Sequence, residues 1–501
     1  MGIILAEHQS CTILLSESEH ACLGKFDKQS FSLSLDKAEY DSIIQIVPRT
    51  FKISRGKTSS CFNISNREND LLIQAGYYIG VDWLIPNIRY IHVEPKLNTS
   101  SAKVFSAILE VENPEGELLY QEKDRYLQKV LSESVNEKDN YREINYLSML
   151  LDAMTSPNIA NETDDLIWID WEAPEIFLEQ VEDRLTPFLI VQFINLLSKI
   201  VRKGLKKSYY TVKEHINNRI KGKILISQQI KQNVMKNRVT KTYCEYQVFD
   251  IDHNENQFLK NVLRFASKYV DDNEVLFGNN IGRVKALITF ILPALEHVSF
   301  IQNEELLRNF KFNPFFKEYK DAVKIGHYIL KRFSYNISKA SNELTKTPPF
   351  WIDMPRLFEL YVYQKLLLHN PLEQHYIKYQ FRTYGNELDY LVSKPGFEMI
   401  IDAKYKMKYS SSLIHQDIRQ VAGYARLKKV LKQVQVLNEE GELLKNGSKS
   451  NDAMIDCMII YPDLDGDADF DFNLEFLREN RCELNAYHRV FKIGVPLPLI
   501  N

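Results

Sequence analysis

The residues whose types and spacing could do chemistry lie on two short apolar segments near residue 400. Residues 386–392 carry Asp389, and residues 399–405 carry Asp402 and Lys404. Side chains two apart on a strand share a face, so Asp402 and Lys404 point the same way, and a hairpin brings Asp389 beside them. Neighbouring carboxylates repel each other unless a cation lies between them, and their hard oxygen ligands suit Mg2+ or Mn2+. The spacing therefore predicts a metal-dependent nuclease centre.

In such a centre each residue type has a chemical task. The metal ion held by Asp389 and Asp402 would acidify a bound water, and the Lys404 ammonium would steady the attacking hydroxide or a phosphate oxygen. An alternative interpretation is structural, because an acid-x-lysine pattern is common in sequences. Asp389 is then a surface acid, and Asp402 with Lys404 is an exposed ion pair.

Helical segments on both sides of the hairpin add polar residues. Upstream, Asp353 is typical of a helix N-cap, Pro355 fits the first turn, and Glu359 is a candidate third carboxylate. Downstream, residues 415–426 have a helical pattern with a polar stripe. The stripe consists of Asp417, Gln420 and Tyr424. Either helix alone is also typical of an ordinary amphipathic helix with a solvated side.

In the order helix, strand, strand, helix, these residues resemble the PD-(D/E)xK nuclease superfamily, in the branch with a Gln-x-x-x-Tyr helix after the catalytic lysine. More narrowly, the chain resembles the McrC family, the nuclease subunit of modification-dependent McrBC restriction systems. Further similar segments are residues 77–80, 93–96, 219–224, 254–256 and 459–462. Leu388 precedes the first acid where the superfamily name shows a proline, so Glu387, on the same strand face, stays open as an alternative first acid.

The resemblance implies a Mg2+-dependent endonuclease that cuts double-stranded DNA, with Mn2+ as a substitute ion. The implied metal ligands are Asp389, Asp402, Glu359 and the backbone carbonyl of Ala403. Lys404 would assist the nucleophile, while Gln420 and Tyr424 would orient the site or hold the DNA strand.

The same resemblance implies a partner that hydrolyses nucleotide. In that family a separate AAA+ GTPase, McrB, forms hexamers and recognises modified DNA, with 5-methylcytosine as the expected base. The amino-terminal region of the McrC subunit enters the hexamer pore and stimulates GTP hydrolysis. This chain is expected to bind no nucleotide itself, because Phe51 stands where a phosphate-binding loop ending in Gly56-Lys-Thr58 needs glycine. Two alternatives stay open: a repair or recombination nuclease coupled to an ATP-driven motor, and a non-catalytic adaptor that activates an AAA+ partner.

The length of 501 residues exceeds what one hydrophobic core usually organises, so several domains are expected. Short alternating strands predict a β-rich, partner-facing head over residues 1–100, and apolar periodicity predicts a mainly helical middle domain over 101–345. Residues 346–501 form the predicted α/β nuclease domain, a mixed central sheet flanked by helices. Within it, the polar residues 437–452 are expected to be an insertion. The predicted fold class is multidomain α+β.

The net charge of -3 conceals a basic segment, residues 202–241. Its lysines and arginines, opposed by Glu214 alone, are Arg202, Lys203, Lys206, Lys207, Lys213, Arg219, Lys221, Lys223, Lys231, Lys236, Arg238 and Lys241. Such an excess can neutralise DNA phosphates or dock an acidic partner. The alternative is a solvated helix face.

Composition and termini predict the compartment. The six cysteines are scattered without a Cys-x-x-Cys spacing, which indicates reduced thiols and no zinc site. The sequence contains no run of 18 apolar residues, and its start lacks the basic region of a signal peptide. A cytoplasmic protein without a membrane segment is expected.

Overall fold

The structure is a computed structural model of the whole chain. It describes residues 2–7, 10–15, 30–35, 37–54, 57–66, 70–94, 143–155, 166–179, 185–300, 314–338, 344–405, 411–434, 455–463, 470–484 and 487–500. The chain divides into two compact units, one of Met1–Ile176 with Thr347–Asn501 and one of Phe177–Lys346. The three-domain division stays a prediction, although its boundary at 345 lies next to a boundary between the units. The fold is mixed α and β, as predicted.

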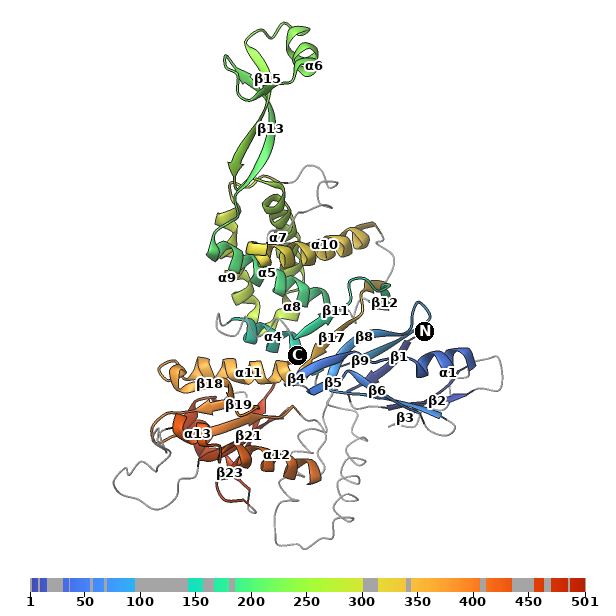
Figure 1. Ribbon diagram of the computed structural model, residues 1–501, viewed down its shortest axis with the longest axis vertical. Helices are drawn as coiled ribbons and strands as arrows, with labels where there is room; N and C mark the ends of the chain where they lie inside the picture. Colours follow the sequence, from blue (N-terminus) through green and yellow to red (C-terminus); the bar gives the residue numbers. More distant parts are fainter. Residues whose placement is uncertain are drawn as a thin grey trace. The chain divides into compact units, whose positions relative to one another are not determined.

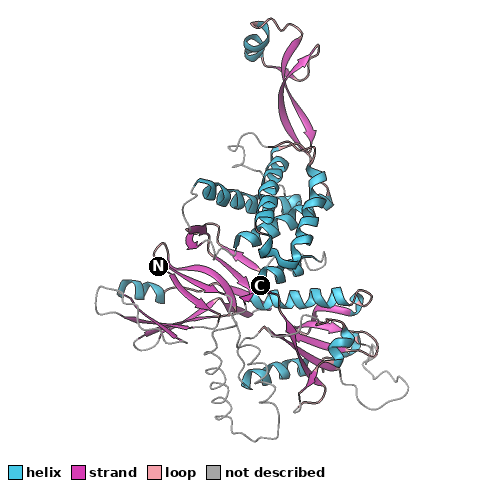
Figure 2. Cartoon of the chain, turned by 180° about the vertical axis from the view of Figure 1, so that it is seen from behind, coloured by secondary structure: helices cyan, strands magenta, loops and turns pink. Residues whose placement is uncertain are grey.

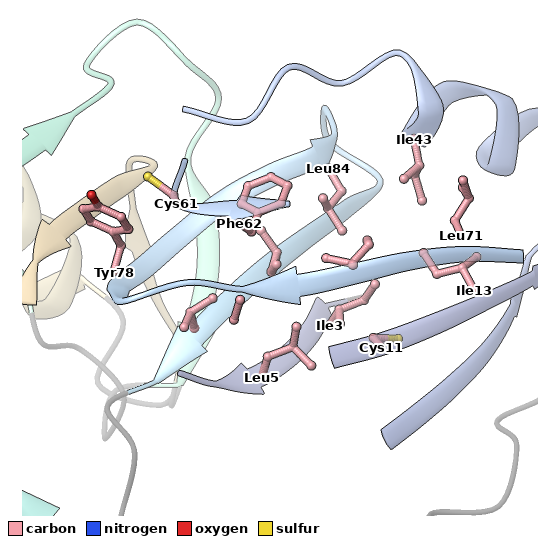
Figure 3. Packing of buried hydrophobic residues seen from close by; sticks show 14 of the residues in the cluster. Ile3, Leu5, Cys11, Ile13, Ile43, Cys61, Phe62, Leu71, Tyr78 and Leu84 are labelled. Atoms are coloured by element: carbon pink, nitrogen blue, oxygen red, sulfur yellow. The ribbon is translucent and has the colours of Figure 1, made fainter. Parts of the chain in front are cut away.

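The amino-terminal head, here the described residues up to Glu94, is built from strands. The sequence predicts strands at residues 12–15, 31–35, 71–73 and 88–93, and the structure has a strand at each of these places. One sheet has the order β3 (Ser30–Leu35), β2 (Ser10–Leu15), β7 (Asp70–Ala75) and β6 (Phe62–Asn66), beside α1 (Lys37–Ile44) and the ribbon of β4 (Thr50–Ser54) and β5 (Lys57–Ser60). Alternating apolar side chains from these strands form one core, as Figure 3 shows for Ile13, Phe62 and Leu71.

A second sheet of the same unit joins the head to a strand that follows it by more than 250 residues. Its order is β1 (Gly2–Ala6), β9 (Arg89–Glu94), β8 (Tyr78–Ile85), β17 (Phe350–Asp353) and β11 (Ile167–Ile169). Gly80 explains the close approach of β8 to β17: its φ is +152°, and a Cβ there would lie 2.0 Å from the carbonyl oxygen of Phe350. The glycine of the 77–80 segment is therefore required by strand pairing.

The carboxyl-terminal part of this unit contains a mixed six-stranded sheet, as predicted. Its order is β18 (Ile377–Thr383), β19 (Asn386–Val392), β20 (Met399–Ala403), β21 (Asp456–Asp463), β23 (Val490–Pro496) and β22 (Cys482–Glu483). Strands β19 and β20 are antiparallel, whereas β20 and β21 are parallel.

Helices flank this sheet. Figure 1 and Figure 2 show α11 (Met354–His369) on one side of it and α12 (Ser411–Tyr424) on the other. Val421 of α12 and Val430 of α13 (Lys428–Gln433) belong to one apolar core with Leu388 and Ile400 of the sheet. The unit also contains α14 (Leu474–Glu479) and α4 (Tyr146–Thr155), and α4 is a predicted helix that packs on α11. Two short strands, β10 (Glu143–Ile144) and β24 (Leu499–Ile500), pair with each other.

The other unit is mainly a group of packed helices, which confirms the helical pattern predicted there. They are α5 (Leu185–Lys203), α7 (Asn254–Asp272), α8 (Glu274–Phe277), α9 (Ile281–Ile291) and α10 (Lys317–Ser338). Strands β12 (Ile176–Glu179) and β16 (Leu344–Thr347) pair where the chain enters and leaves the unit. The apolar pattern also predicts a helix at residues 104–109, and both this segment and the predicted insertion at 437–452 lie outside the described residues.

Helix α5 is long and apolar enough to cross a membrane by length and composition, with a mean hydropathy of 1.3. Yet 67% of that stretch is buried inside the protein, mainly against α9 and α10. This burial is typical of the core helix of a helical bundle.

Arg202 and Lys203 of the basic segment end helix α5, but most of the segment forms the first strand and the tip of a long hairpin, so the helix-face alternative is wrong for that part. Strands β13 (Ser208–Asn217) and β15 (Lys241–Asp250) pair along their whole length and extend from the helices of their unit (Figure 1). Between them lie β14 (Lys223–Ile224), α6 (Ile226–Gln229) and a π-helical turn, Ile230–Val234. We call residues 208–250 the arm and residues 218–240 its tip.

Candidate active site

The hairpin of β19 and β20 lies inside the mixed sheet and brings the two predicted aspartates together. Tyr390 pairs with Ile401, so Asp389 and Asp402 are the next residues along the two strands. The backbone N–H of Ala403 donates a hydrogen bond of 2.8 Å to Oδ2 of Asp389. All five residues of β20 are buried, and Asp402 is only 1% exposed. The alternative of an exposed ion pair between Asp402 and Lys404 is therefore wrong.

Lys404 completes a compact triplet with these acids. Its Nζ lies 2.8 Å from Oδ2 of Asp402, and its side chain is 18% exposed. Its backbone N–H donates to the carbonyl oxygen of Ile460 at 2.9 Å, which continues the pairing of β20 with β21 by one residue. The lysine is thus held by both its backbone and its side chain.

In the triplet, the two carboxyl groups of Asp389 and Asp402 lie beside a single cation, the ammonium group of Lys404. Burial and the neighbouring Asp402 raise the pKa of Asp389 to about 7. Burial lowers the pKa of Lys404, but the carboxylates of Asp402 and Asp389 outweigh it and raise that pKa above its ordinary value. Lys404 therefore stays protonated, while Asp389 is poised to exchange a proton near neutral pH.

Glu359 is brought to the same place by the helix that the sequence predicts. The side chain of Asp353 caps α11 by accepting a hydrogen bond of 3.0 Å from the backbone N–H of Arg356. The hydroxyl of Tyr390 donates to the carbonyl oxygen of Glu359 at 2.6 Å, which fixes the helix on β19. Burial, followed by the charge of Asp389, raises the pKa of Glu359 well above its ordinary value.

The polar stripe of α12 also reaches the site. Nε2 of Gln420 donates to the hydroxyl of Tyr424 at 2.8 Å, and this bond orients both side chains. Burial raises the pKa of Tyr424, with a further contribution from Asp402, so the ring lies within electrostatic reach of the triplet. Asp417 is 3% exposed, and its charge favours protonated Lys404. The sequence places Asp417 on the stripe but gives it no role.

Two other acids near the site have structural partners. Glu387, the alternative first acid, pairs through Oε1 with Nε of the exposed Arg382 at 2.9 Å. Burial raises the pKa of the capping residue Asp353 to about 6. Among the acids of β19, Asp389 is therefore the one that faces Asp402.

The donor set fits a hard divalent cation. Within the described residues, no three His, Cys, Asp or Glu side chains are clustered closely enough to hold a metal ion as they stand. The pair of Asp389 and Asp402 is nevertheless assembled, and beside its ion pair with Lys404 the buried Asp402 carboxylate has no further hydrogen-bond partner among the described residues. A buried carboxylate in that condition favours a further cation, and oxygen-only ligands suit Mg2+. The metal ligand set stays a prediction.

Sequence reasoning missed several residues that support the site. Arg356 lowers the pKa of Glu359 through its charge, and Tyr390 anchors α11. Tyr405 is 4% exposed and contacts the head through a hydrogen bond to Glu7. In the sequence, the only signal for Tyr390 and Tyr405 is that each directly follows a predicted site residue, Asp389 or Lys404. The sequence contains no signal that would identify Glu7.

The tip of the arm is the second region with features of a functional surface. Its exposed apolar side chains include Ile226 at 70%, Met235 at 77% and Val239 at 87% exposure. Its exposed basic side chains are Arg219, Lys221, Lys223, Lys231, Lys236 and Arg238. Oε1 of Gln229 accepts hydrogen bonds from Asn233 and from the backbone of Tyr243, both at 2.6 Å, which holds the tip together.

The tip turn also accounts for a glycine in the 219–224 segment. Gly222 has a φ of +69°, and a Cβ there would lie 2.3 Å from the carbonyl oxygen of Glu245. Only glycine allows β14 to approach β15 so closely.

Comparisons with known proteins identify a family. Over residues 171–435 the sequence matches the family described as McrBC 5-methylcytosine restriction system component. No curated protein matches the sequence.

Two solved structures from Thermococcus gammatolerans are similar. The first, McrB AAA+ hexamers with bound McrC, shares 15% identity over 99% of this chain and 94% of that one, with a TM-score of 0.35. The second, the McrBC complex, shares 15% identity over 74% and 88%, with a TM-score of 0.27. These TM-scores are too low to support any argument about this chain.

Proposed function

Because that match covers more than half of its length, the chain belongs to the McrBC 5-methylcytosine restriction system component family, and we propose that it is the nuclease subunit of such a system. The observation that carries the proposal is the juxtaposition of Asp389 on β19 with buried Asp402 on β20 and Lys404 directly after it. The proposed activity is Mg2+-dependent endonucleolytic cleavage of DNA in a PD-(D/E)xK-type domain.

In the proposed mechanism, Asp389, Asp402, Glu359 and the Ala403 carbonyl would hold Mg2+ or Mn2+. A divalent ion bound there would supply an acidified water and neutralise charge on the phosphate. Asp389 would have to lose a proton to act as a ligand, because burial and Asp402 raise its pKa to about 7 in the free protein. Protonated Lys404 stabilises negative charge on the attacking or phosphate oxygen. Tyr424, held by Gln420, orients the DNA strand.

The proposed partner is an AAA+ GTPase hexamer that recognises methylated DNA and whose GTP hydrolysis this chain stimulates. The resemblance assigns partner contact to the amino-terminal region, and we extend this proposal to the tip of the arm. Exposed apolar residues such as Met235 and Val239 cost free energy in water and fit a protein surface, while the surrounding lysines fit acidic residues.

The test is plasmid cleavage with Mg2+ by the purified chain, with and without its co-expressed AAA+ partner and GTP. Asp402→Asn keeps the shape of the side chain but removes its charge, and cleavage should be lost. Glu387→Gln is the matched control, because Glu387 pairs with Arg382, and cleavage should be retained.

The same experiment separates the alternatives. Cleavage without the partner would favour a repair or recombination nuclease. Stimulated nucleotide hydrolysis without cleavage by the unaltered chain would favour the non-catalytic adaptor. Loss of cleavage in Glu387→Gln but not in Asp402→Asn would contradict the proposed site.

A further inference from the structure

A buried hydrogen bond joins the start of the chain to the nuclease site. The hydroxyl of Tyr405 donates to Oε2 of Glu7 at 3.1 Å, and both residues are buried, with exposures of 4% and 0%. The two residues are 398 positions apart in sequence. Tyr405 directly follows Lys404, so the bond is made one residue from the proposed catalytic lysine.

Both ends of this bond are fixed by their surroundings. The backbone N–H of Glu7 donates to the carbonyl oxygen of Glu94 at 3.2 Å, which continues the pairing of β1 with β9. The ring of Tyr405 lies 5.8 Å from the ring of Phe358, which is on α11 one residue before Glu359. Burial and the charge of Glu7 raise the pKa of Tyr405, so its hydroxyl stays a donor.

The head approaches the site at a second point as well. Tyr77 precedes β8, and burial together with the charges of Asp417 and Glu7 raises its pKa. Asp417 in turn favours protonated Lys404. On the other side, Tyr78 of β8 pairs with Asp353, the cap of the helix that carries Glu359. The head therefore contacts the chain next to Lys404, and its strand β8 pairs with the residue that caps the helix carrying Glu359.

We propose that Glu7 and Tyr405 are positioning residues for the nuclease site: the head carboxylate holds the tyrosine hydroxyl and thereby fixes the backbone of Lys404. The inference rests on the proposed function. Lys404 is anchored on one side by its hydrogen bond to Ile460 and on the other by Tyr405. Without the second anchor, its ammonium keeps its charge but loses its alignment with the reacting phosphate. The head is then part of the catalytic unit as well as a proposed partner surface.

The test compares two tyrosine hydroxyls that are buried in the same unit. Tyr405→Phe removes the donor to Glu7 and keeps the ring. Tyr361→Phe is the control, because its hydroxyl donates to the carbonyl oxygen of Pro496 at 3.2 Å, away from the triplet. For each variant, kcat and KM for plasmid cleavage are measured with the partner and GTP, beside the melting temperature and Mg2+ binding to the DNA-free protein by calorimetry.

Tyr405→Phe should lower kcat roughly 10-fold, since a small misplacement of a catalytic group has effects of this order. KM and Mg2+ affinity should stay within about twofold, because the metal ligands keep their places. Both variants should lower the melting temperature by similar amounts, because each loses one buried hydrogen bond. Tyr361→Phe should leave kcat unchanged. Glu7→Gln, whose amide oxygen still accepts the hydroxyl, should recover most of the rate that Glu7→Ala loses.

The outcomes distinguish the positioning role of Glu7 and Tyr405 from the proposed nuclease activity on which it rests. If the unaltered chain cleaves DNA and Tyr405→Phe has the kcat of Tyr361→Phe, the positioning role is overturned and the nuclease stands. If Tyr405→Phe weakens Mg2+ binding or raises KM as well as lowering kcat, the hydrogen bond is merely structural. The positioning role of Glu7 and Tyr405 is then likewise overturned. If the unaltered chain never cleaves DNA, both proposals are wrong.

Discussion

Two antiparallel hairpins of this chain use charged residues in opposite ways. Every residue of β20 in the β19–β20 hairpin is buried, whereas no residue of β13 in the arm is fully buried. In the first, Lys404 and Asp402 lie 2.8 Å apart with side-chain exposures of 18% and 1%. In the second, Lys213 and Glu245 lie 3.0 Å apart with exposures of 51% and 29%.

The difference shows that burial of a hairpin determines how strongly its charged side chains interact with each other. Buried charges interact strongly because the surrounding dielectric is low, so they shift each other's pKa and can drive chemistry. Exposed pairs are screened by water and contribute about 0–1 kcal/mol to folding. The arm's exposed charges can therefore exchange their partners for another molecule at little cost, whereas Asp402 and Lys404 of the β19–β20 hairpin are committed to each other.

The largest expected effect comes from removing the buried lysine. Lys404→Ala should slow plasmid cleavage at least about 10²-fold, because the charge that stabilises the transition state is lost. It should also lower the metal-free stability by about 3 kcal/mol, since Asp402 is left buried without its cation. Partner binding should persist, as measured by co-elution.

The same change on the other hairpin sharpens the comparison. Lys213→Ala breaks an exposed pair outside the tip and should alter stability by less than about 1 kcal/mol, with cleavage unchanged. Loss of assembly in Lys404→Ala, or equal effects of the two substitutions, would contradict the distinction.

The second prediction concerns the tip of the arm. Met235→Asp and Val239→Asp should each weaken binding to the AAA+ partner more than about 10-fold, since central apolar anchors dominate protein interfaces. Mg2+ binding to the isolated chain should not change. Affinity is measured by titration of the labelled partner.

A charge variant of the tip distinguishes the partner from DNA. Lys236→Ala with Arg238→Ala should weaken partner binding less than the aspartate variants do. If the double variant instead weakens DNA binding and reduces its salt dependence while the aspartate variants have no effect, the tip is a DNA contact.

A third prediction follows from the raised pKa of Asp389. In the free protein this carboxyl is half-protonated at about pH 7, and it must lose its proton to become a ligand. Mg2+ affinity should therefore fall about tenfold per unit as pH decreases below 7 and level off above it. Calorimetry in two buffers of different ionisation enthalpy would detect the released proton.

The stability of the metal-free protein should show the opposite trend. Because the folded pKa lies above the ordinary value of 3.8, the folded state binds more protons than the unfolded state between pH 3.8 and about pH 7. Stability without metal should decrease as pH rises through that window, and Mg2+ should offset the decrease. A melting temperature that rises with pH in the absence of metal would contradict this account.

The smallest expected effect is on the polar stripe. Tyr424→Phe removes the acceptor of the Gln420 hydrogen bond and should lower kcat/KM about fivefold, in line with about 1 kcal/mol for one hydrogen bond. Tyr384→Phe is the control, because Tyr384 is 75% exposed at a hairpin turn. An effect above about 100-fold would make Tyr424 a direct participant in the chemistry.

Much of the site could be predicted because its signals are local. A turn between two apolar segments predicts the β19–β20 hairpin. Asp353, two residues before Pro355, predicts the cap of α11. Spacings of three and four placed Gln420 beside Tyr424. Periodicity and capping depend on residues within one or two turns, so the sequence displays them directly.

The arm shows where local signals were present but misread. Tyr209, Tyr210 and Val212 are typical of strands, yet the density of lysines suggested a helix face as the alternative. The pairing partners begin at Lys241, after a tip of more than 20 residues, so no short turn marked the hairpin.

The sequence by itself determined the residue types of the site, their order on helix and strands, and the family. Only the tertiary structure decided that β17 pairs with β8, that Asp402 is buried with Lys404, and that Glu7 holds Tyr405. The physical reason is distance along the chain. Burial and pKa shifts depend on which remote segments cover a residue, and a pattern within one segment carries no information about them.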